Sequence, residues 1–303
     1  MLQIVGIILP LFAIIALGKA AVRWHFMDSS GSAALSSFTF YVPIPALLFG
    51  LMAELQISLG VSGAYLAGCL VIYAIALWVG RWLADSSLAH RAVFALDTTF
   101  GNVTFLGVPL ILSVWGKDGL GHLVGIIVVT TSLIPLSVIL MEISDKRQTR
   151  SAGATKNMVL GILKNPVINS MIIGFFWRVT GIPIPDPLHN FLDILAKAAP
   201  PLALFCLGTS LPAISWEVIR EGLSGTFLKL VIMPLLVATL CYSIGFTGLA
   251  LAVAVLTAGL PTGANAFLIA RGTTTYGESS ATTVVMATMM SVITLPIILY
   301  LLR

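Results

Sequence analysis

The stretch LTAGLPTGANAFLIARG, residues 256–272, is apolar enough to lie in a membrane, yet helix-breaking residues crowd its middle. Pro261 removes a backbone donor, and Gly259 and Gly263 allow non-helical dihedrals. A second stretch, FGNVTFLGVPL at 100–110, also combines two glycines, a proline and an asparagine. The two stretches therefore predict two discontinuous helices, one in each half of the chain.

The composition places the chain in a lipid bilayer. Of its 303 residues, 58% are hydrophobic and only 9% are charged, and the mean hydropathy is +1.04. Soluble domains carry about 25% charged residues. Apolar tracts of helical length recur without strand-like alternation, which favours an all-α membrane protein over a barrel. The net charge of +4 is scattered and does not indicate a nucleic-acid partner.

The apolar tracts predict ten transmembrane helices, since a hydrocarbon core of ~30 Å needs ~20 residues per helix. We place the spans near 2–22, 33–53, 61–83, 92–114, 123–143, 165–181, 188–211, 225–245, 248–270 and 280–302. Most of the 16 Lys and Arg residues, Lys229 and Arg271 among them, flank odd-numbered loops. Lys117, Arg178 and Arg303 lie on the other side, so the odd loops are expected in the cytoplasm and both termini outside.

A polar segment divides the spans into two halves. Residues 1–143 form a first five-helix repeat, 144–164 a cytoplasmic linker and 165–303 a second five-helix repeat. Because each half has an odd number of spans, the second enters the membrane from the opposite side. This predicts an inverted five-plus-five repeat.

The two breaks are the candidate binding site. Half-helix N-termini present unpaired N–H groups and partial positive charge, which favour a carboxylate. Asn102 and Asn265 lie beside the breaks and can donate and accept hydrogen bonds. For either asparagine alone, a helix–helix hydrogen bond is the alternative. Pro261 and Gly263 would open the backbone beside Asn265.

Few charges fall within the spans. Asp97 lies one turn before the first break and is the candidate for binding a coupling proton or cation, with a snorkelling or capping role near the membrane surface as the alternative. Asp193 and Lys197, four apart, are expected to form a structural ion pair, although a deeper Lys197 could attract an anion. Arg271 is either a positive-inside anchor or a second point of anion attraction.

Nothing in the sequence indicates an enzyme. No HExxH, GxSxG or phosphate-loop motif occurs, and the four histidines are expected in loops or at span ends. Glu221 is expected at a solvated membrane end, and Ser279 or Ser280 as the cap of the last span. The three cysteines fit no metal or disulfide spacing and are expected to be packing residues. No catalytic residue, metal or other cofactor is predicted.

The pattern resembles the auxin efflux carrier family, which includes plant auxin exporters and bacterial malate and malonate permeases. The resembling stretches are FYVPIPALLF (40–49), FGNVTFLGVPLI (100–111), AAPPLALFCLGTSL (198–211) and LPTGANAFLIA (260–270). The resemblance implies crossed broken helices 4 and 9, a scaffold domain of spans 1, 2, 6 and 7, a transport domain of spans 3–5 and 8–10, and homodimers formed through the scaffold. It assigns the substrate site to Asn102, Pro109, Pro261 and Asn265.

The leading hypothesis is a secondary transporter of small organic anions, such as malate, malonate or auxin-like acids, in a bacterial cytoplasmic membrane. It would work by an elevator-like or rocking alternating-access motion. A sodium- or proton-coupled symporter of the bile-acid symporter type is the alternative within this architecture. A membrane sensor that binds its ligand without transporting it is the alternative of another class.

Overall fold

The computed structural model describes residues 2–54, 60–82, 87–144, 166–211, 219–263, 266 and 277–302. All regular secondary structure in these ranges is helical, and the one β-type contact is an isolated bridge between Gly101 and Thr262. The predicted linker beyond residue 144, together with Asn265 and Arg271, lies outside the described residues.

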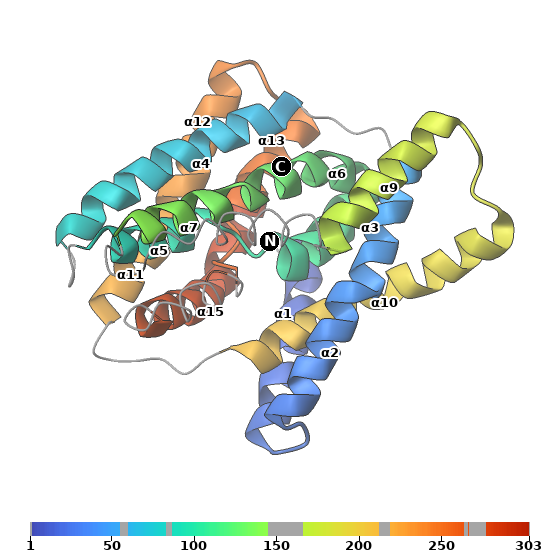
Figure 1. Ribbon diagram of the computed structural model, residues 1–303, viewed down its shortest axis with the longest axis horizontal. Coiled ribbons are helices and arrows are strands. Elements are labelled where there is room, and N and C mark those ends of the chain that lie inside the picture. The colour runs from blue at the N-terminus through green and yellow to red at the C-terminus, as the bar shows by residue number, and fades with distance from the viewer. Residues whose placement is uncertain are drawn as a thin grey trace.

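The described helices follow the apolar tracts of the sequence (Figure 1). In chain order they are α1 (Leu2–Arg23), α2 (Ser29–Tyr41), α3 (Pro43–Glu54), α4 (Gly60–Val79), η1 (Gly80–Trp82), α5 (Leu88–Thr99), η2 (Val103–Gly107), α6 (Val108–Thr131), α7 (Leu133–Ser144), α9 (Pro166–Thr180), α10 (Asp186–Ser210), α11 (Ile219–Phe227), η3 (Leu228–Ile232), α12 (Met233–Ser243), α13 (Gly248–Ala258) and α15 (Gly277–Leu301).

Six helical stretches in the described ranges are long and apolar enough to cross a membrane. They are Ser29–Glu54, Gly60–Trp82, Val103–Thr130, Asp186–Ser210, Ile219–Ser243 and Ser279–Leu301. Large apolar side chains such as Trp78, Phe176 and Ile293 are at least 60% exposed, which suits a surface that faces lipid. The chain is thus a helical multi-pass membrane protein, while the ten-span inverted repeat stays a prediction.

The helices pack in two groups that are distinct in Figure 1. One contains α1, α2, α3, α9 and α10, where α10 packs on α1, α2 and α3, and α3 packs on α9. The other contains α4, α5, α7, α11, α12, α13 and α15, where α5 packs on α4 and α7, α11 on α15, and α12 on α4 and α13. Helix α6 contacts members of both groups.

Glycines let α1 and α10 approach to backbone contact. A Cβ atom added at Gly208 would lie 2.0 Å from the carbonyl oxygen of Ile15, and one added at Gly18 would lie 2.2 Å from that of Phe205. Small residues allow this close packing between membrane helices, where no hydrophobic effect drives association. The α1–α10 pair therefore has a fixed backbone interface.

Glycine also sets the shape of α6. Gly116 has a φ of 62°, in the left-handed region, and the helix bends at this residue. The bend separates the part of α6 that follows the first predicted break from the part that continues towards α7. Lys117, directly after the bend, is directed towards the first helix group, where it meets Glu54 of α3.

Candidate functional site

The two predicted breaks lie side by side and are hydrogen-bonded to each other. The amide of Asn102 donates to the carbonyl of Pro261 at 2.7 Å, and the amide of Gly263 donates to the carbonyl of Phe100 at 2.9 Å. These bonds flank the antiparallel bridge between Gly101 and Thr262. We call the paired segments Phe100–Asn102 and Pro261–Gly263 the crossing. The pairing satisfies backbone groups that the breaks release from their helices, as a membrane interior requires.

The glycines of the crossing are needed for this close approach. A Cβ atom on Gly263 would lie 2.9 Å from a ring carbon of Phe100 and 3.2 Å from the carbonyl oxygen of Gly101. A Cβ atom on Gly107 would lie 2.7 Å from the side chain of Leu260. The contact between the two stretches therefore accounts for Gly107 and Gly263, whereas Gly259 is required by packing against Ile298 of α15.

Helix ends of both polarities meet at the crossing. Helix α5 ends at Thr99 and α13 ends at Ala258, and the C-terminal end of a helix carries partial negative charge. The helical stretch that begins at Val103 and continues into α6 presents its positive N-terminal end. Pro109 is the second residue of α6 and is buried, a position where the missing amide hydrogen is tolerated.

Asn102 caps the stretch that begins at Val103. Its Oδ1 accepts a hydrogen bond from the amide of Phe105 at 3.3 Å. The residue is 2% exposed, and its Nδ2 finds no hydrogen-bond partner among the residues that the structure describes. A buried N–H donor without an acceptor destabilises the folded protein by about 1–3 kcal/mol, so binding of a ligand whose oxygen accepts this hydrogen bond would be favoured.

Lys229 is the site residue that the sequence analysis missed. It lies in η3, is fully buried, and donates from Nζ to the carbonyl of Ala258 at 2.6 Å. A Cβ atom added to Gly101 would lie 3.4 Å from the same Nζ, so the ammonium group lies between the end of α13 and the first segment of the crossing. The prediction that Lys229 flanks a cytoplasmic loop is wrong.

The error came from the predicted start of the eighth span. The span was drawn from residue 225, whereas α11 begins at Ile219, ten residues before Lys229. At 1.5 Å per residue, Lys229 lies about 15 Å along the helix axis. One signal was available, because Lys229 is the single charged residue between Glu221 and Arg271.

Asp97 is buried beside the crossing, so its solvent-facing alternative is excluded. It is 1% exposed, and its Oδ1 accepts a hydrogen bond from the hydroxyl of Ser280 at 2.7 Å. Its main-chain carbonyl accepts from the hydroxyl of Thr262 at 2.7 Å. Ser279 and Ser280 do not cap the last helix, because α15 already begins at Gly277. Ser280 instead joins α15 to α5.

A buried histidine–carboxylate pair joins α5, the helix of Asp97, to α11. The Nε2 atom of His90 contacts Oε1 of Glu221, and both side chains are buried between α5 and α11. The prediction that Glu221 is solvated is wrong. His90 lies in the first turn of α5, at a helix end as predicted, but its side chain is buried. Residues 131 apart in the chain form the pair, so local hydrophobicity gives no sign of it.

The remaining predicted site residues fall in different places. Lys197 is exposed on α10 and pairs with Asp193 at 2.6 Å, which confirms the predicted ion pair. Pro261 and Gly263 are buried and form half of the crossing. The three cysteines are free and buried, as expected of packing residues. Among the described residues, no cluster of three potential metal ligands occurs.

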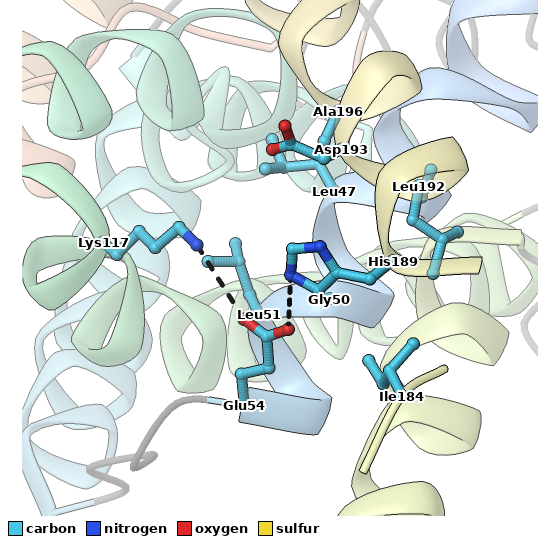
Figure 2. Close-up of a pocket in the computed structure, with 11 residues that line it drawn as sticks. Leu47, Gly50, Leu51, Glu54, Lys117, Ile184, His189, Leu192, Asp193 and Ala196 are labelled. Atoms are coloured by element: carbon cyan, nitrogen blue, oxygen red, sulfur yellow. Dashed lines mark ion pairs between the residues drawn. The ribbon is translucent and has the colours of Figure 1, made fainter. Parts of the chain in front are cut away.

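A groove lies where α6 meets the first helix group (Figure 2). Glu54, at the end of α3, pairs with Lys117 of α6 at 3.8 Å and with His189 of α10 at 3.1 Å. Leu47, Leu51, Leu192 and Ala196 form the apolar part of its wall. The Glu54–Lys117 pair therefore links the first helix group to α6 at the rim of an open groove.

These features define a class of protein: a helical membrane protein whose two interrupted segments meet in a buried polar site. The model of the family described as "Membrane transport protein" matches residues 3–299, and the chain belongs to this family, the auxin efflux carrier family. It is therefore a membrane transporter by family, as its resemblance predicted.

Known relatives include bacterial and plant proteins. A candidate malonate transporter of Rhizobium meliloti (strain 1021) is 27% identical over 326 residues, covering 100% of this chain and 97% of that protein. The uncharacterized transporter YfdV of Escherichia coli (strain K12) is 25% identical, covering 99% and 98%. Auxin efflux carrier component 5 of Arabidopsis thaliana is 22% identical, covering 89% and 88%.

Proposed function

We propose that the protein is a secondary transporter of small organic carboxylates and that the substrate binds at the crossing. The observation that carries this proposal is the buried Nδ2 donor of Asn102, which has no partner among the described residues and lies at the positive start of the helical stretch Val103–Thr130. A carboxylate oxygen would accept this hydrogen bond and be favoured by the helix dipole. Asn265, Pro109, Pro261 and Gly263 complete the proposed site.

The substrate class follows from the donors rather than from the fold. The relatives include a candidate malonate transporter and an auxin efflux carrier component, and both malonate and auxin are carboxylic acids. The site joins an amide donor with an apolar core formed by residues such as Leu106 and Leu260, which suits a small anion with a short carbon skeleton.

Transport is proposed to occur by alternating access in a ten-span inverted repeat. The scaffold would be the group α1, α2, α3, α9 and α10, and the transport domain would be the group that carries the crossing. Support comes from the separate packing of these groups, which meet through α6 and where α1 packs on α15. Movement of one group against the other would expose a fixed site to each side in turn.

The pair at the groove supports such a motion. Both partners of the Glu54–Lys117 pair are substantially exposed, at 38% and 63% of their side chains. Exposed ion pairs contribute about 0–1 kcal/mol. A contact of this strength can break and re-form as the groups move, so the groove is the proposed sliding surface between them.

Asp97 is the proposed coupling residue. A buried carboxylate that accepts one hydroxyl hydrogen bond from Ser280 can hold a proton or meet a cation beside the substrate. Proton coupling is proposed first, because among the described residues no group of three His, Cys, Asp or Glu side chains gathers to hold a cation. The buried His90–Glu221 pair, whose histidine shares α5 with Asp97, would connect Asp97 to the cytoplasmic side.

The remaining parts of the proposal concern placement in the cell. The protein would lie in a bacterial cytoplasmic membrane with both termini outside, and would form a homodimer through its scaffold helices. It would have no enzymatic activity and no cofactor. Arg271 and the exposed Lys197 would attract anions towards the membrane surface.

A counterflow assay tests the proposal. Purified protein is reconstituted in liposomes loaded with unlabelled malonate or malate, and entry of the radiolabelled acid is measured. We expect entry above empty liposomes in the wild type and at least a tenfold loss in Asn102→Ala and Asn265→Ala, on the scale of about 1.4 kcal/mol of lost binding. Wild-type entry in both variants would reject the site. Binding of the acid without entry would favour the sensor alternative.

A further inference from the structure

Lys229 is a buried cation that the proposed site has not yet used. Its side chain is fully buried in η3, and no carboxylate among the described residues forms an ion pair with it. An ammonium group has three N–H donors, and the structure gives one hydrogen bond, to the carbonyl of Ala258 at 2.6 Å. Two of its donors therefore have no acceptor among the residues that the structure describes.

The position of the ammonium group is that of a bound cation. Ala258 is the last residue of α13, and its carbonyl points away from the helix with partial negative charge. Gly101 follows the end of α5, and a Cβ atom added to it would lie 3.4 Å from the same Nζ. In transporters with broken helices, half-helix C-terminal ends and unwound carbonyls hold the coupling cation. In this protein the ammonium group of Lys229 lies against such a helix C-terminal end, that of α13.

A structural purpose alone does not account for this burial. Moving an ammonium ion out of water costs several kcal/mol, and a methionine of similar length would fill the space without that cost. The chain contains a useful comparison, because Lys19 of α1 also donates to a carbonyl at 2.6 Å, that of Leu211 at the end of α10. Lys19 is exposed, whereas Lys229 is buried at the crossing.

We propose that the ammonium group of Lys229 is the resident cation of the crossing. It neutralises the negative ends of α5 and α13, where a sodium ion would otherwise bind, and it offers its free N–H donors to a carboxylate of the substrate. This inference rests on the proposed function and adds two consequences to it. Transport does not require sodium, and the site selects an anion through a fixed positive charge as well as through the amide of Asn102.

The first part of the test uses the wild-type protein. Malonate counterflow is measured in proteoliposomes in sodium chloride and in choline chloride at equal ionic strength. The inference expects equal rates in the two salts. A rate that falls at least about fivefold when sodium is replaced by choline would overturn the inference, while the counterflow itself would leave the proposed function intact.

The second part uses Lys229→Met, with Lys19→Met as the matched control. Both variants replace a lysine that donates to a helix-end carbonyl, but only the first lies at the crossing. We expect Lys229→Met to lose at least about tenfold in malonate affinity, the scale of one charge-assisted hydrogen bond, and Lys19→Met to keep wild-type affinity. Affinity is measured by titration calorimetry on detergent-purified protein.

Sodium dependence separates this role from simple packing. If removal of the ammonium group in Lys229→Met leaves a site that sodium can occupy, sodium should raise the residual malonate affinity of this variant, whereas choline should not. Wild-type affinity in Lys229→Met, or lost affinity that sodium does not raise, would overturn the inference. Should this variant fail to purify as a folded protein, the sodium test on the wild type still decides. Absence of counterflow in the wild type for malonate, malate and acetate would reject the proposed function, and the inference with it.

Discussion

The substitution Asn102→Asp separates the capping role of this residue from its proposed binding role. In the structure, Oδ1 accepts the amide hydrogen of Phe105, while Nδ2 has no partner among the described residues. Aspartate has the same shape and keeps an oxygen at the capping position. It replaces the Nδ2 donor with a second oxygen, which cannot donate to a carboxylate. The helix cap is therefore retained and the proposed ligand contact is removed.

The size of the effect follows from the bonds that change. Aspartate and asparagine cap helices about equally well, so the cap contributes little to the difference. A hydrogen bond to a charged group contributes about 1.5–3 kcal/mol, and each 1.4 kcal/mol changes a dissociation constant tenfold. Asn102→Asp should therefore weaken malonate binding by at least about tenfold, and repulsion between two carboxylates would weaken it further.

The assay is titration of purified protein with malonate, together with thermal unfolding of each variant. Asn190→Asp is the matched control, because it is the same substitution at an exposed position of α10. The control should bind as the wild type does. Unchanged malonate affinity in Asn102→Asp, with unfolding like that of the wild type, would refute the reasoning that places the ligand at the Nδ2 donor.

Three further substitutions test coupling, motion and packing. Asp97→Asn keeps an oxygen for the Ser280 hydroxyl but cannot release a proton, so malonate uptake should stop responding to an imposed pH gradient; an unchanged response would exclude Asp97 as the coupling group. Cysteines at Glu54 and Lys117, joined by a short reducible thiol reagent, should block counterflow until a reductant is added, because the pair ties the first helix group to α6, the helix that contacts both groups. Gly208→Ala should destabilise the protein by about 1–3 kcal/mol in thermal unfolding, since its Cβ would lie 2.0 Å from a backbone oxygen of α1. Gly6→Ala, with no atom within 4 Å, should unfold like the wild type.

The breaks were predictable because their cause is local. A single proline such as Pro10 or Pro296 stays within a helix here, whereas Pro and Gly clustered within a few residues, as at Pro261 and Gly263, mark an interruption that the sequence alone can locate. The hydrogen bonds between the two breaks join residues about 160 positions apart, and no local pattern specifies such a contact. Two matching breaks in opposite halves made the pairing a reasonable hypothesis, and the coordinates supply its register.

The charged residues were harder to place. Lys229 and Glu221 lie near the start of an apolar span, where a shift of a few residues in the predicted boundary moves a side chain from the surface to the middle of the membrane. Glu221 is paired with His90 from another helix, and Lys229 with the end of α13. Burial of a charge depends on such distant partners, so hydropathy along the chain could not reveal it.

The most direct test of the central claim is to locate the ligand. A crystal structure of the protein grown with bromosuccinate, a small dicarboxylate that carries an anomalous scatterer, would show where the anion binds. The account predicts a bromine peak at the crossing, with a carboxylate oxygen within hydrogen-bond distance of Asn102 Nδ2 and Lys229 Nζ. Full occupancy at another place, such as the groove beside Glu54, with neither donor in contact, would contradict it.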